Sequence, residues 1–295
     1  MAQMKRAVER ARERLGEKLW IARALLRRKL LACLEGTASL RGAFAPRHRF
    51  CIVSCERHAG AAALKCLDSV YRQRYDRRLV RHVFIDDASC DGTHELVLRW
   101  LETHPDHNVD YIRQEECKGG TSNTLLGFRR AGPETLMVEL NGDDWLAGRG
   151  TLAFLSRIYA DPEVWMTYNT LRYDRGLPAL WARPVPEEVV TANAFREMEE
   201  WVTSAPHTFR RRLFDHIDEA TFRDPETGDY WESADDQAIY LAMLELAGRH
   251  ARHLHRVTYV YNFRELSHCF HGSDLSEGRA RRIRRQAKYR PLEVL

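Results

Sequence analysis

The strongest constraint on the fold of this chain is a regular alternation of short apolar runs with segments of helical periodicity, which begins at Arg49. Five apolar runs have the pattern of strands: RFCIVS, RHVFID, VDYIRQ, TLMVEL and EVWMTYN. Four segments with helical spacing separate them: AALKCLDSVYRQ, DGTHELVLRWLETH, TSNTLLGFRRAG and TLAFLSRIYADP. Strands that alternate with helices predict an α/β fold with a mostly parallel central sheet flanked by helices.

Composition sets the broad class of the protein. With 295 residues, of which 44% are hydrophobic, the chain is long enough for one large domain with additions. It has no apolar run of about 18 residues and no apolar centre of a secretory signal, so we expect neither a transmembrane helix nor a leader. Seven cysteines without a CxxC pair predict reduced thiols in a cytoplasmic protein and argue against a zinc site.

Positive charge is concentrated at the two ends of the chain. Residues 1–47 carry a net charge of +8 and residues 279–295 carry +6, which leaves −10 for residues 48–278 of a chain whose total is +4. A domain that binds nucleic acid needs a basic patch interleaved with aromatic residues, and the acidic middle has none. We therefore expect no nucleic-acid partner.

Residues 4–34 have the pattern of one long amphipathic helix, and a linker follows to residue 47. The apolar positions of this helix are Val8, Ala11, Leu15, Leu19, Ala22, Leu26 and Leu30. Three alternatives are open for it: peripheral contact with an anionic membrane, pairing with a copy of itself in a homodimer, or docking on its own domain. Residues 264–295 are expected to form a basic segment after the folded domain.

Polar clusters follow three of the predicted strands: SCER at 54–57, DDAS at 86–89 and NGDD at 141–144. Ligands of open α/β sheets bind outside the carboxyl ends of the strands, so we expect these clusters to meet at one edge. Asp143 and Asp144 suit a hard divalent cation that itself holds phosphate. The glycine-bearing loop at 118–123 either wraps a ligand or makes a turn. No GxxxxGK[ST] or GxGxxG motif follows a strand, which argues against a P-loop or a dinucleotide site.

Taken in order, the segments IVSCERHAG, LKCLDSVYRQRY, HVFIDDASCDGT, LVLRWL and ELNGDDWL resemble the nucleotide-binding half of glycosyltransferase family 2, which has the GT-A fold. The resemblance continues through TSAPHTFRRRLFDHI, ADDQAIYLAMLELAGRH and VTYVYN, and covers about residues 49–263. It implies a Rossmann-like domain at 48–263, with a nucleotide-sugar-binding half at 48–170 and an acceptor half at 171–263. It also implies a metal-dependent, inverting transfer of a sugar from a nucleotide diphosphate, with UDP-sugars favoured, to an acceptor hydroxyl.

The resemblance implies a set of donor-binding residues at the strand ends and in the glycine loop: Ser54, Glu56, Asp87, Lys118, Asn123, Asn141 and Asp143. Of these, Ser54 and Glu56 would line the nucleoside pocket, and Asp87 matches the aspartate that contacts the nucleobase. Asp143 and Asp144 match the acidic pair that binds Mn²⁺ or Mg²⁺, with Asp144 in direct contact with the metal.

Inversion at the anomeric carbon also needs a general base that takes the proton of the acceptor hydroxyl. The segment SADDQAIYLAMLE opens a predicted helix with Asp235 and Asp236 in its first turn, and the family's base matches Asp236, with Asp235 beside it. Acids also favour a helix N-terminus without any chemistry, so N-capping is the alternative explanation. His207 is expected near the acceptor, and His268 or His271 is a candidate for the metal shell.

Four further side chains are weaker candidates. Arg210 and Arg211 either contact phosphate or form a solvated basic turn. Trp145 and Trp231 either stack on a sugar face or belong to the core.

The chain departs from the family pattern in three places. The opening segment SCER lacks the family's Pro and Tyr, the first acid of the DxDD pattern is Asn141, and the helix after the glycine loop lacks the usual Arg. These departures leave open a non-catalytic GT-A-like scaffold, and the basic ends leave open a membrane-surface binding protein. For an active enzyme we expect a glycan or glycolipid acceptor in surface polysaccharide or glycoconjugate synthesis, at the cytoplasmic face of a membrane.

Overall fold

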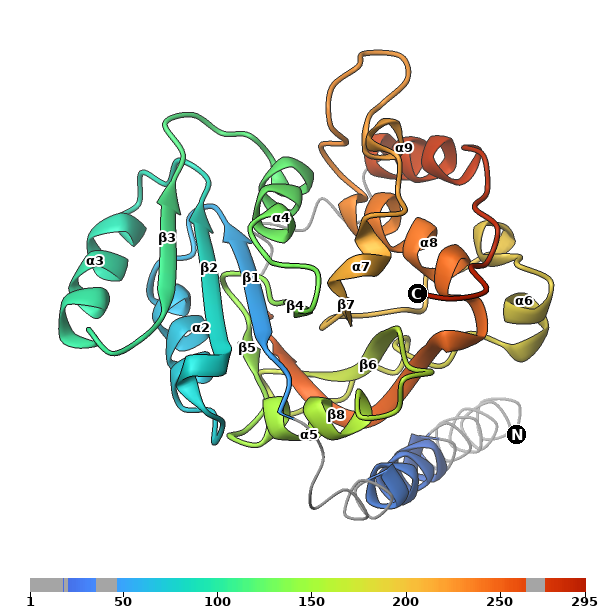
Figure 1. The fold of residues 1–295 in the computed structure, drawn as a ribbon, viewed down its shortest axis with the longest axis horizontal. Coiled ribbons are helices and arrows are strands. Elements are labelled where there is room, and N and C mark those ends of the chain that lie inside the picture. The colour runs from blue at the N-terminus through green and yellow to red at the C-terminus, as the bar shows by residue number, and fades with distance from the viewer. Residues whose placement is uncertain (1–17, 19–20, 36–46, 264–273) are drawn as a thin grey trace, which may run out of the picture.

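The computed structural model describes residues 18, 21–35, 47–263 and 274–295, and these form an α/β domain around a single eight-stranded sheet (Figure 1). The strands are β1 (Phe50–Glu56), β2 (Val80–Asp86), β3 (Val109–Arg113), β4 (Leu136–Glu139), β5 (Trp145–Leu146), β6 (Met166–Tyr173), β7 (Thr208–Arg210) and β8 (Ala251–Tyr261). They lie in the order β3-β2-β1-β4-β7-β6-β8-β5. The predicted α/β class is confirmed.

The sheet is parallel in the half that comes first in the chain. β1 pairs in parallel with β2 and β4, and β2 pairs in parallel with β3. In the second half β6 pairs in parallel with β8, whereas β7 runs antiparallel to β4 and β6, and β5 runs antiparallel to β8. Parallel strands end at the same edge, so the carboxyl ends of β1, β2 and β3 all point the same way.

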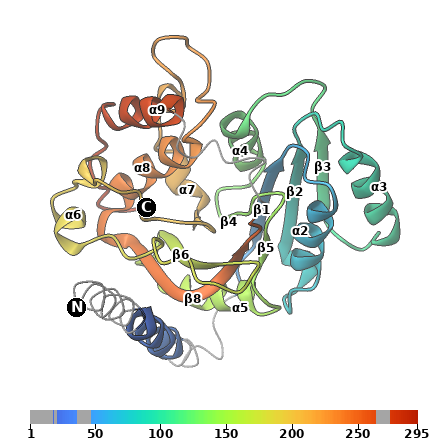
Figure 2. The ribbon, with the colours of Figure 1, turned by 180° about the vertical axis from the view of Figure 1, so that it is seen from behind.

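Helices cover both faces of the sheet (Figures 1 and 2). They are α2 (Ala61–Tyr71), α3 (Thr93–Thr103), α4 (Gly120–Arg129), α5 (Thr151–Ile158), α6 (Glu187–Thr191), α7 (Arg211–Phe214), α8 (Asp235–Ala247) and α9 (Asp274–Arg284). Short 3₁₀ turns lie at Arg77–Leu79, Phe195–Glu197, Glu219–Phe222 and Gly248–His250. No helix among the described residues is both long enough and apolar enough to cross a membrane.

The central strand β1 is buried on both faces, as its continuous apolar run predicts. Phe50 and Ile52 belong to the cluster of buried side chains on one face, and Cys51 and Val53 belong to the cluster on the other. Successive residues of a strand point to opposite faces, so one short run supplies both halves of the core.

An ion pair in the core fixes the position of α8. Arg196 donates to the two carboxylate oxygens of Glu245 at 2.5 and 2.9 Å, and its third contact is the carbonyl of Ile283 at 2.7 Å. Both side chains of the pair are almost fully buried. Removing one partner would leave a buried charge uncompensated, which typically costs about 3–5 kcal/mol.

The basic C-terminal segment folds back onto the acidic middle of the chain. Arg282 of α9 forms an ion pair with Asp224 at 2.7 Å, and Arg284 donates to the side-chain oxygen of Gln237 at 2.8 Å. Much of the positive charge at this end therefore neutralises the protein's own acids.

The N-terminal helix, described over residues 21–35, docks on its own domain and lies beside β8 in both views (Figures 1 and 2). Arg28 donates to the carbonyls of Ala179 and Ala182 at 3.1 and 2.6 Å. Glu35 accepts from the backbone N–H of His255 at 2.8 Å. Of the three alternatives for this helix, docking is the one present in the structure. The predicted apolar positions Val8, Ala11, Leu15 and Leu19 lie outside the described residues.

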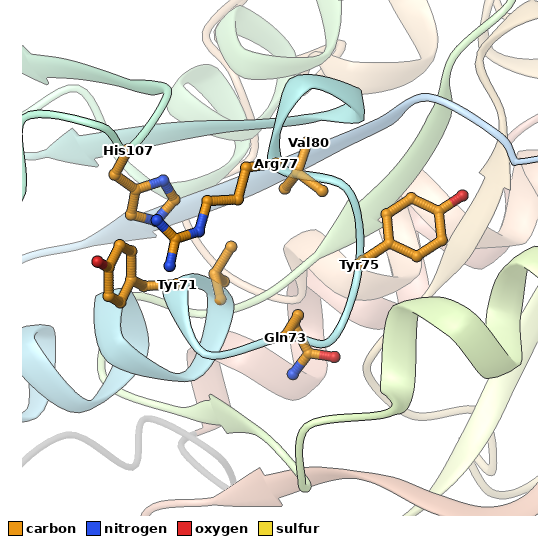
Figure 3. A pocket seen from close by; sticks show the side chains of 7 residues that line it. Tyr71, Gln73, Tyr75, Arg77, Val80 and His107 are labelled. Atoms are coloured by element: carbon orange, nitrogen blue, oxygen red, sulfur yellow. The ribbon is translucent and has the colours of Figure 1, made fainter.

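A small pocket lies at the amino ends of the strands, opposite the edge where β1 and β2 terminate (Figure 3). Tyr71, Arg77 and His107 gather on one side of it, whereas the ring of Tyr75 points away from them, and its water-accessible space is only about 10 Å³. Space for about one water is too small for a substrate, so this pocket is not the functional site.

We predict that Gly127→Ala destabilises the domain, because a Cβ at this position of α4 would lie 2.3 Å from Cγ1 of Val53 in β1. Overpacking costs about 1–3 kcal/mol, and the better helix propensity of Ala offsets up to about 1 kcal/mol of it. Urea unfolding measures the net loss. Gly132→Ala is the matched control, since its Cβ would meet nothing nearer than 4.0 Å. Equal stability of the two variants would contradict the close packing of α4 on β1.

Candidate active site

The carboxyl end of β1 holds the two acidic turns of the sheet edge. The backbone N–H of Asp87, just after β2, donates to the carbonyl of Glu56 at 3.0 Å. The backbone N–H of Gly142, just after β4, donates to the carbonyl of Cys55 at 3.2 Å. The predicted convergence of the three polar clusters at one edge is therefore present.

Three carboxyl groups crowd together beside β1: those of Glu56, Asp143 and Asp144. A Cβ on Gly142 would lie 2.6 Å from Cβ of Glu56, so the absence of a side chain lets the turn after β4 approach this closely. Burial and the nearby Asp143 raise the pKa of Glu56 well above its usual range. Burial and Asp143 also raise the pKa of Asp144 to about 8. Such a cluster favours either shared protons or a bound cation.

Asp144 is the most enclosed of the three acids, with 1% of its surface exposed. One carboxylate oxygen accepts from the Tyr259 hydroxyl at 2.6 Å, and the other accepts from the backbone N–H of Asn262 at 2.6 Å. The side-chain amide of Asn141 donates, at 3.4 Å, to the same Asp144 oxygen that accepts from Tyr259. Asp143 is partly exposed.

The carboxyl cluster fits a hard cation in the chemistry of its donors, because crowded carboxylates gain most from a divalent charge. No group of three or more His, Cys, Asp or Glu side chains arranged to hold a metal occurs among the described residues. The predicted metal ligand His271 and its neighbour His268 lie outside the described residues. A cation here would need oxygens from a bound diphosphate to complete its shell.

Asp87 holds the glycine loop that precedes α4. Its carboxylate accepts from the backbone N–H groups of Lys118 and Gly119 at 2.7 and 3.0 Å, and from the Cys117 thiol at 3.1 Å. Burial raises the pKa of Asp87, but the hydrogen bonds from Lys118, Asn123 and the other donors outweigh it and leave the pKa below its ordinary value. The donor-side turn and the glycine loop are thus joined through one carboxylate.

Two of the predicted donor-binding residues are buried, and a third contributes its backbone and not its side chain. Ser54 is fully buried, and its hydroxyl contacts Nε2 of His82 at 2.9 Å, so the structure does not bring this side chain to the nucleoside pocket. Lys118 joins the site through its backbone, whereas its ammonium group pairs with Glu116. Asn123 is buried and accepts from the Gln114 amide at 2.8 Å.

A cavity of about 560 Å³ connects the sheet edge with the start of α8. Asn141, from the sheet edge, lines it together with Asp235, Asp236 and His207. Tyr173, Trp181, Trp201, Tyr261 and Phe263 form much of the remaining wall. This volume lies within the range of sites for small organic ligands. The structure thus brings the predicted base, His207 and Asn141 to one space.

The two acids of α8 follow a strained residue. Ala234 has φ of 57°, a left-handed conformation that non-glycine residues seldom adopt. A Cβ on Gly120 would lie 2.6 Å from a carboxylate oxygen of Asp235, so the glycine loop and the start of α8 almost touch. Burial, Asp236 and Glu139 raise the pKa of Asp235 to about 7. The cap residue of α8 is Ala234, which makes no side-chain cap hydrogen bond, so neither acid is the N-cap; Asp235 and Asp236 each accept from the backbone N–H of the next residue, at 3.1 and 2.8 Å.

Sequence reasoning did not select Glu139, which ends β4 and lines the same cavity. It pairs with Nδ1 of His207 at 2.9 Å, and the His207 ring stacks on Tyr240 with centroids 3.7 Å apart. A sequence signal for Glu139 does exist, because it is the only charged residue of the apolar run TLMVEL. Tyr259, the partner of Asp144, gave no such signal, because it lies 115 positions away, in β8.

The weaker candidates are structural. Arg210 donates to the carbonyls of Val164 and Tyr159, and Arg211 donates to the carbonyl of Phe128, so neither guanidinium is directed at a phosphate site. Trp231 is 1% exposed and belongs to the core. Trp145 is partly exposed and has Lys65 over its ring at 4.8 Å.

The sequence matches the model of glycosyl transferase family 2 over residues 50–214, more than half of the chain. The matched range contains β1 to β7, and therefore both acidic turns of the sheet edge. It ends before α8, so the match does not include Asp235 and Asp236. No curated protein matches the chain.

Solved glycosyltransferase structures share the fold. S. aureus TarS in complex with UDP-GlcNAc aligns with a TM-score of 0.57 at 16% identity, over 75% of this chain and 60% of that one. The mannosyltransferase PcManGT from Pyrobaculum calidifontis, in complex with GDP-Man and Mn²⁺, aligns at 0.54 and 21% identity, over 83% and 68%. GalNAc-T7 with UDP, GalNAc and Mn²⁺ aligns with a TM-score of 0.51 at 13% identity, over 74% of this chain and 44% of that one. The chain therefore spans about 60% of the TarS fragment.

We predict that Asp235→Asn removes a pH dependence of stability. The native pKa of Asp235 is about 7, whereas an aspartate in the unfolded chain titrates near 4. Between these values the native state binds the proton more tightly, so this group makes the wild type lose stability as pH rises from 4 to 7. The difference in the free energy of unfolding between the variant and the wild type should grow by at most about 1.4 kcal/mol per pH unit.

Chemical denaturation at pH 5, 6 and 7 provides the measurement, and exposed Asp174→Asn is the control. If both variants follow the wild-type pH profile, Asp235 does not have the raised pKa.

Proposed function

Because the chain belongs to glycosyl transferase family 2, we propose that it transfers a sugar, with inversion, from a nucleotide diphosphate donor to an acceptor hydroxyl. The observation that carries this proposal is the cavity shared by Asn141, at the acidic sheet edge, and Asp236, at the start of α8. This cavity therefore lies between the acidic turn that contains Asn141, on the proposed donor side, and the candidate base Asp236. UDP-sugars are the favoured donors, in keeping with the ligands of TarS and GalNAc-T7.

On the donor side, Glu56 and Asp87 would bind the nucleoside, and the glycine loop would close on the diphosphate. Asp87 fits this role because it already fixes the loop through Lys118 and Gly119. Backbone N–H groups of a glycine-bearing loop at the start of a helix are suited to phosphate oxygens. The buried Ser54 would support the nucleoside pocket from behind and would not touch the ligand.

Asp143 and Asp144 are the residues that would hold Mn²⁺ or Mg²⁺ together with the donor diphosphate. The hydrogen bonds from Tyr259 and Asn262 orient the carboxylate of Asp144, which we assign to direct contact with the cation, with Asp143 beside it. When bound, the cation supplies charge neutralisation of the leaving diphosphate. PcManGT and GalNAc-T7 were solved with Mn²⁺.

On the acceptor side, Asp236 would take the proton of the acceptor hydroxyl as its oxygen attacks the anomeric carbon. The bond from that carbon to the diphosphate oxygen breaks, and its electron pair leaves with the nucleoside diphosphate. Asp235 would orient the acceptor from the adjacent position, next to Gly120 of the donor loop. The Glu139–His207 pair would hold that wall of the cavity in place.

The aromatic wall of the cavity supports a carbohydrate acceptor, either a glycan or a glycolipid. Tyr173 packs edge-on against Tyr261 and Phe263, with ring centroids 5.9 and 5.5 Å apart, and Trp181 donates to the Tyr173 hydroxyl at 3.2 Å. Flat aromatic faces suit the C–H faces of sugar rings. We propose a role in surface polysaccharide or glycoconjugate synthesis at the cytoplasmic face of a membrane.

A non-catalytic GT-A-like scaffold is the alternative, and Asn141 in place of an acid is the observation that favours it. The amide of Asn141 donates to Asp144, so the substitution exchanges one carboxylate for a donor within the cluster. A scaffold could bind nucleotide but would release no diphosphate from a nucleotide sugar.

We predict that at least one UDP-, GDP- or dTDP-sugar raises the thermal unfolding midpoint in the presence of Mn²⁺ or Mg²⁺, and that chelation removes most of the shift. Asp143→Asn should lose the metal-dependent part of the shift while Asp174→Asn keeps it. A panel in which no nucleotide sugar with metal stabilises the wild type would reject the donor site.

We predict that Asp236→Asn lowers sugar transfer by about 10²–10⁴-fold, the usual contribution of a general base, while nucleotide-sugar binding stays at the wild-type level. Release of nucleoside diphosphate measures transfer, and calorimetry measures binding. Exposed Asp174→Asn should match the wild type in both. Loss of binding in Asp236→Asn would assign this residue to the donor site or to folding instead.

A further inference from the structure

The helix described over residues 21–35 has two apolar faces, and only one of them packs on the domain. The inward face consists of partly buried residues: Ile21, Ala24, Leu25, Arg28, Leu31, Ala32 and Glu35. These positions recur at intervals of three and four, as expected for one side of a helix. The hydrogen bonds of Arg28 and Glu35 to the domain fix the rotation of the helix about its own axis.

The outward face displays large apolar side chains. Leu26, Leu30 and Leu34 are 71%, 61% and 55% exposed. At about 100° per residue they fall within an arc of about 80°, with Lys29 on one side and Arg27 on the other; Arg23, one turn earlier, falls within the same arc. An apolar stripe with flanking cations is the pattern of a helix that lies in the plane of a membrane surface.

The charges of this face favour an anionic lipid surface over a second copy of the chain. Residues 21–34 contain four cations and no Asp or Glu, and Glu35 is already bound to His255. No ion pair to Arg23, Arg27 or Lys29 occurs within the described part of the chain. Self-pairing through the leucines would bring these cations face to face, whereas anionic headgroups would neutralise them.

We propose that the outward face of helix 21–35, formed by Leu26, Leu30 and Leu34 with Lys29, is a docking surface for an anionic membrane, and that Arg23 and Arg27, which border the space beneath the helix, reach the headgroups from its edge. The leucines insert among the lipid chains, and the long basic side chains reach the headgroups. Residues 48–278 carry a net charge of −10 and are repelled by the same surface. The acidic body of the domain is therefore expected to face away from the bilayer.

The docked helix is also connected to the acceptor cavity. Arg28 holds the loop that follows β6, through the carbonyls of Ala179 and Ala182. In this loop Leu180 lines a space of about 460 Å³ beneath the helix, and the next residue, Trp181, lines the acceptor cavity. A membrane bound at the helix thus lies next to the loop that borders the cavity. The docking surface itself does not depend on the proposed transfer reaction.

Co-sedimentation of the full chain with vesicles tests the proposal. The wild type should bind vesicles of phosphatidylcholine with 30 mol% phosphatidylglycerol at least fivefold better than pure phosphatidylcholine, and 0.5 M NaCl should remove most of this preference. The double variant Leu26→Ser/Leu30→Ser should reduce binding at least tenfold. Leu98→Ser is the matched control, because Leu98 is an exposed leucine of α3 (40%) remote from this face, and it should bind like the wild type.

Thermal unfolding of each variant separates lost docking from lost folding, and Arg27→Gln/Lys29→Gln provides a second route. This variant keeps the apolar stripe and should lose the preference for anionic vesicles. Binding of the leucine variant at the wild-type level would overturn the proposal, as would absence of wild-type binding. A wild-type dimer by light scattering that becomes a monomer in Leu26→Ser/Leu30→Ser, without vesicle binding, would assign the face to a second copy instead.

Discussion

The site depends on the parallel pairing of β1 with both of its neighbours. Because β1 lies between β2 and β4, its last two carbonyls are within reach of both acidic turns, and each accepts one backbone N–H from them. The same strand fills the core on both faces. A change of register by one residue would exchange its two faces and would also separate the turns that carry Asp87 and Asp143.

Crowding of like charges is the second consequence of this arrangement. Each adjacent Asp pair divides into a more enclosed and a more available member. Asp86 is fully buried and binds the N–H of Ser89, whereas Asp87 reaches the glycine loop. Asp144 is enclosed by Tyr259 and Asn262, whereas Asp143 stays partly exposed. In each pair the more enclosed acid stabilises its own turn.

The cavity beside α8 is built from segments far apart in the chain. Its wall combines the end of β4, the His207 segment, the start of α8 and the aromatic residues after β6 and β8. The buried pair of Arg196 and Glu245 and the return of α9 hold α8 against this wall. The strained Ala234 therefore sits where several packed elements determine its conformation, as is common beside functional groups.

The sequence alone determined the alternating architecture, the convergence of the polar strand ends and the family, because periodicity and short motifs are local properties of the chain. It also located Asp236 and His207 in the half that lines the cavity. The tertiary structure decided what each polar group faces. In the folded chain Ser54 is buried in the core, and Arg210 and Arg211 donate to backbone carbonyls. Glu139 and Tyr259 line the site. The tertiary structure also decided which face of the N-terminal helix is covered. These outcomes depend on contacts between residues many tens of positions apart, and local pattern contains no information about such contacts.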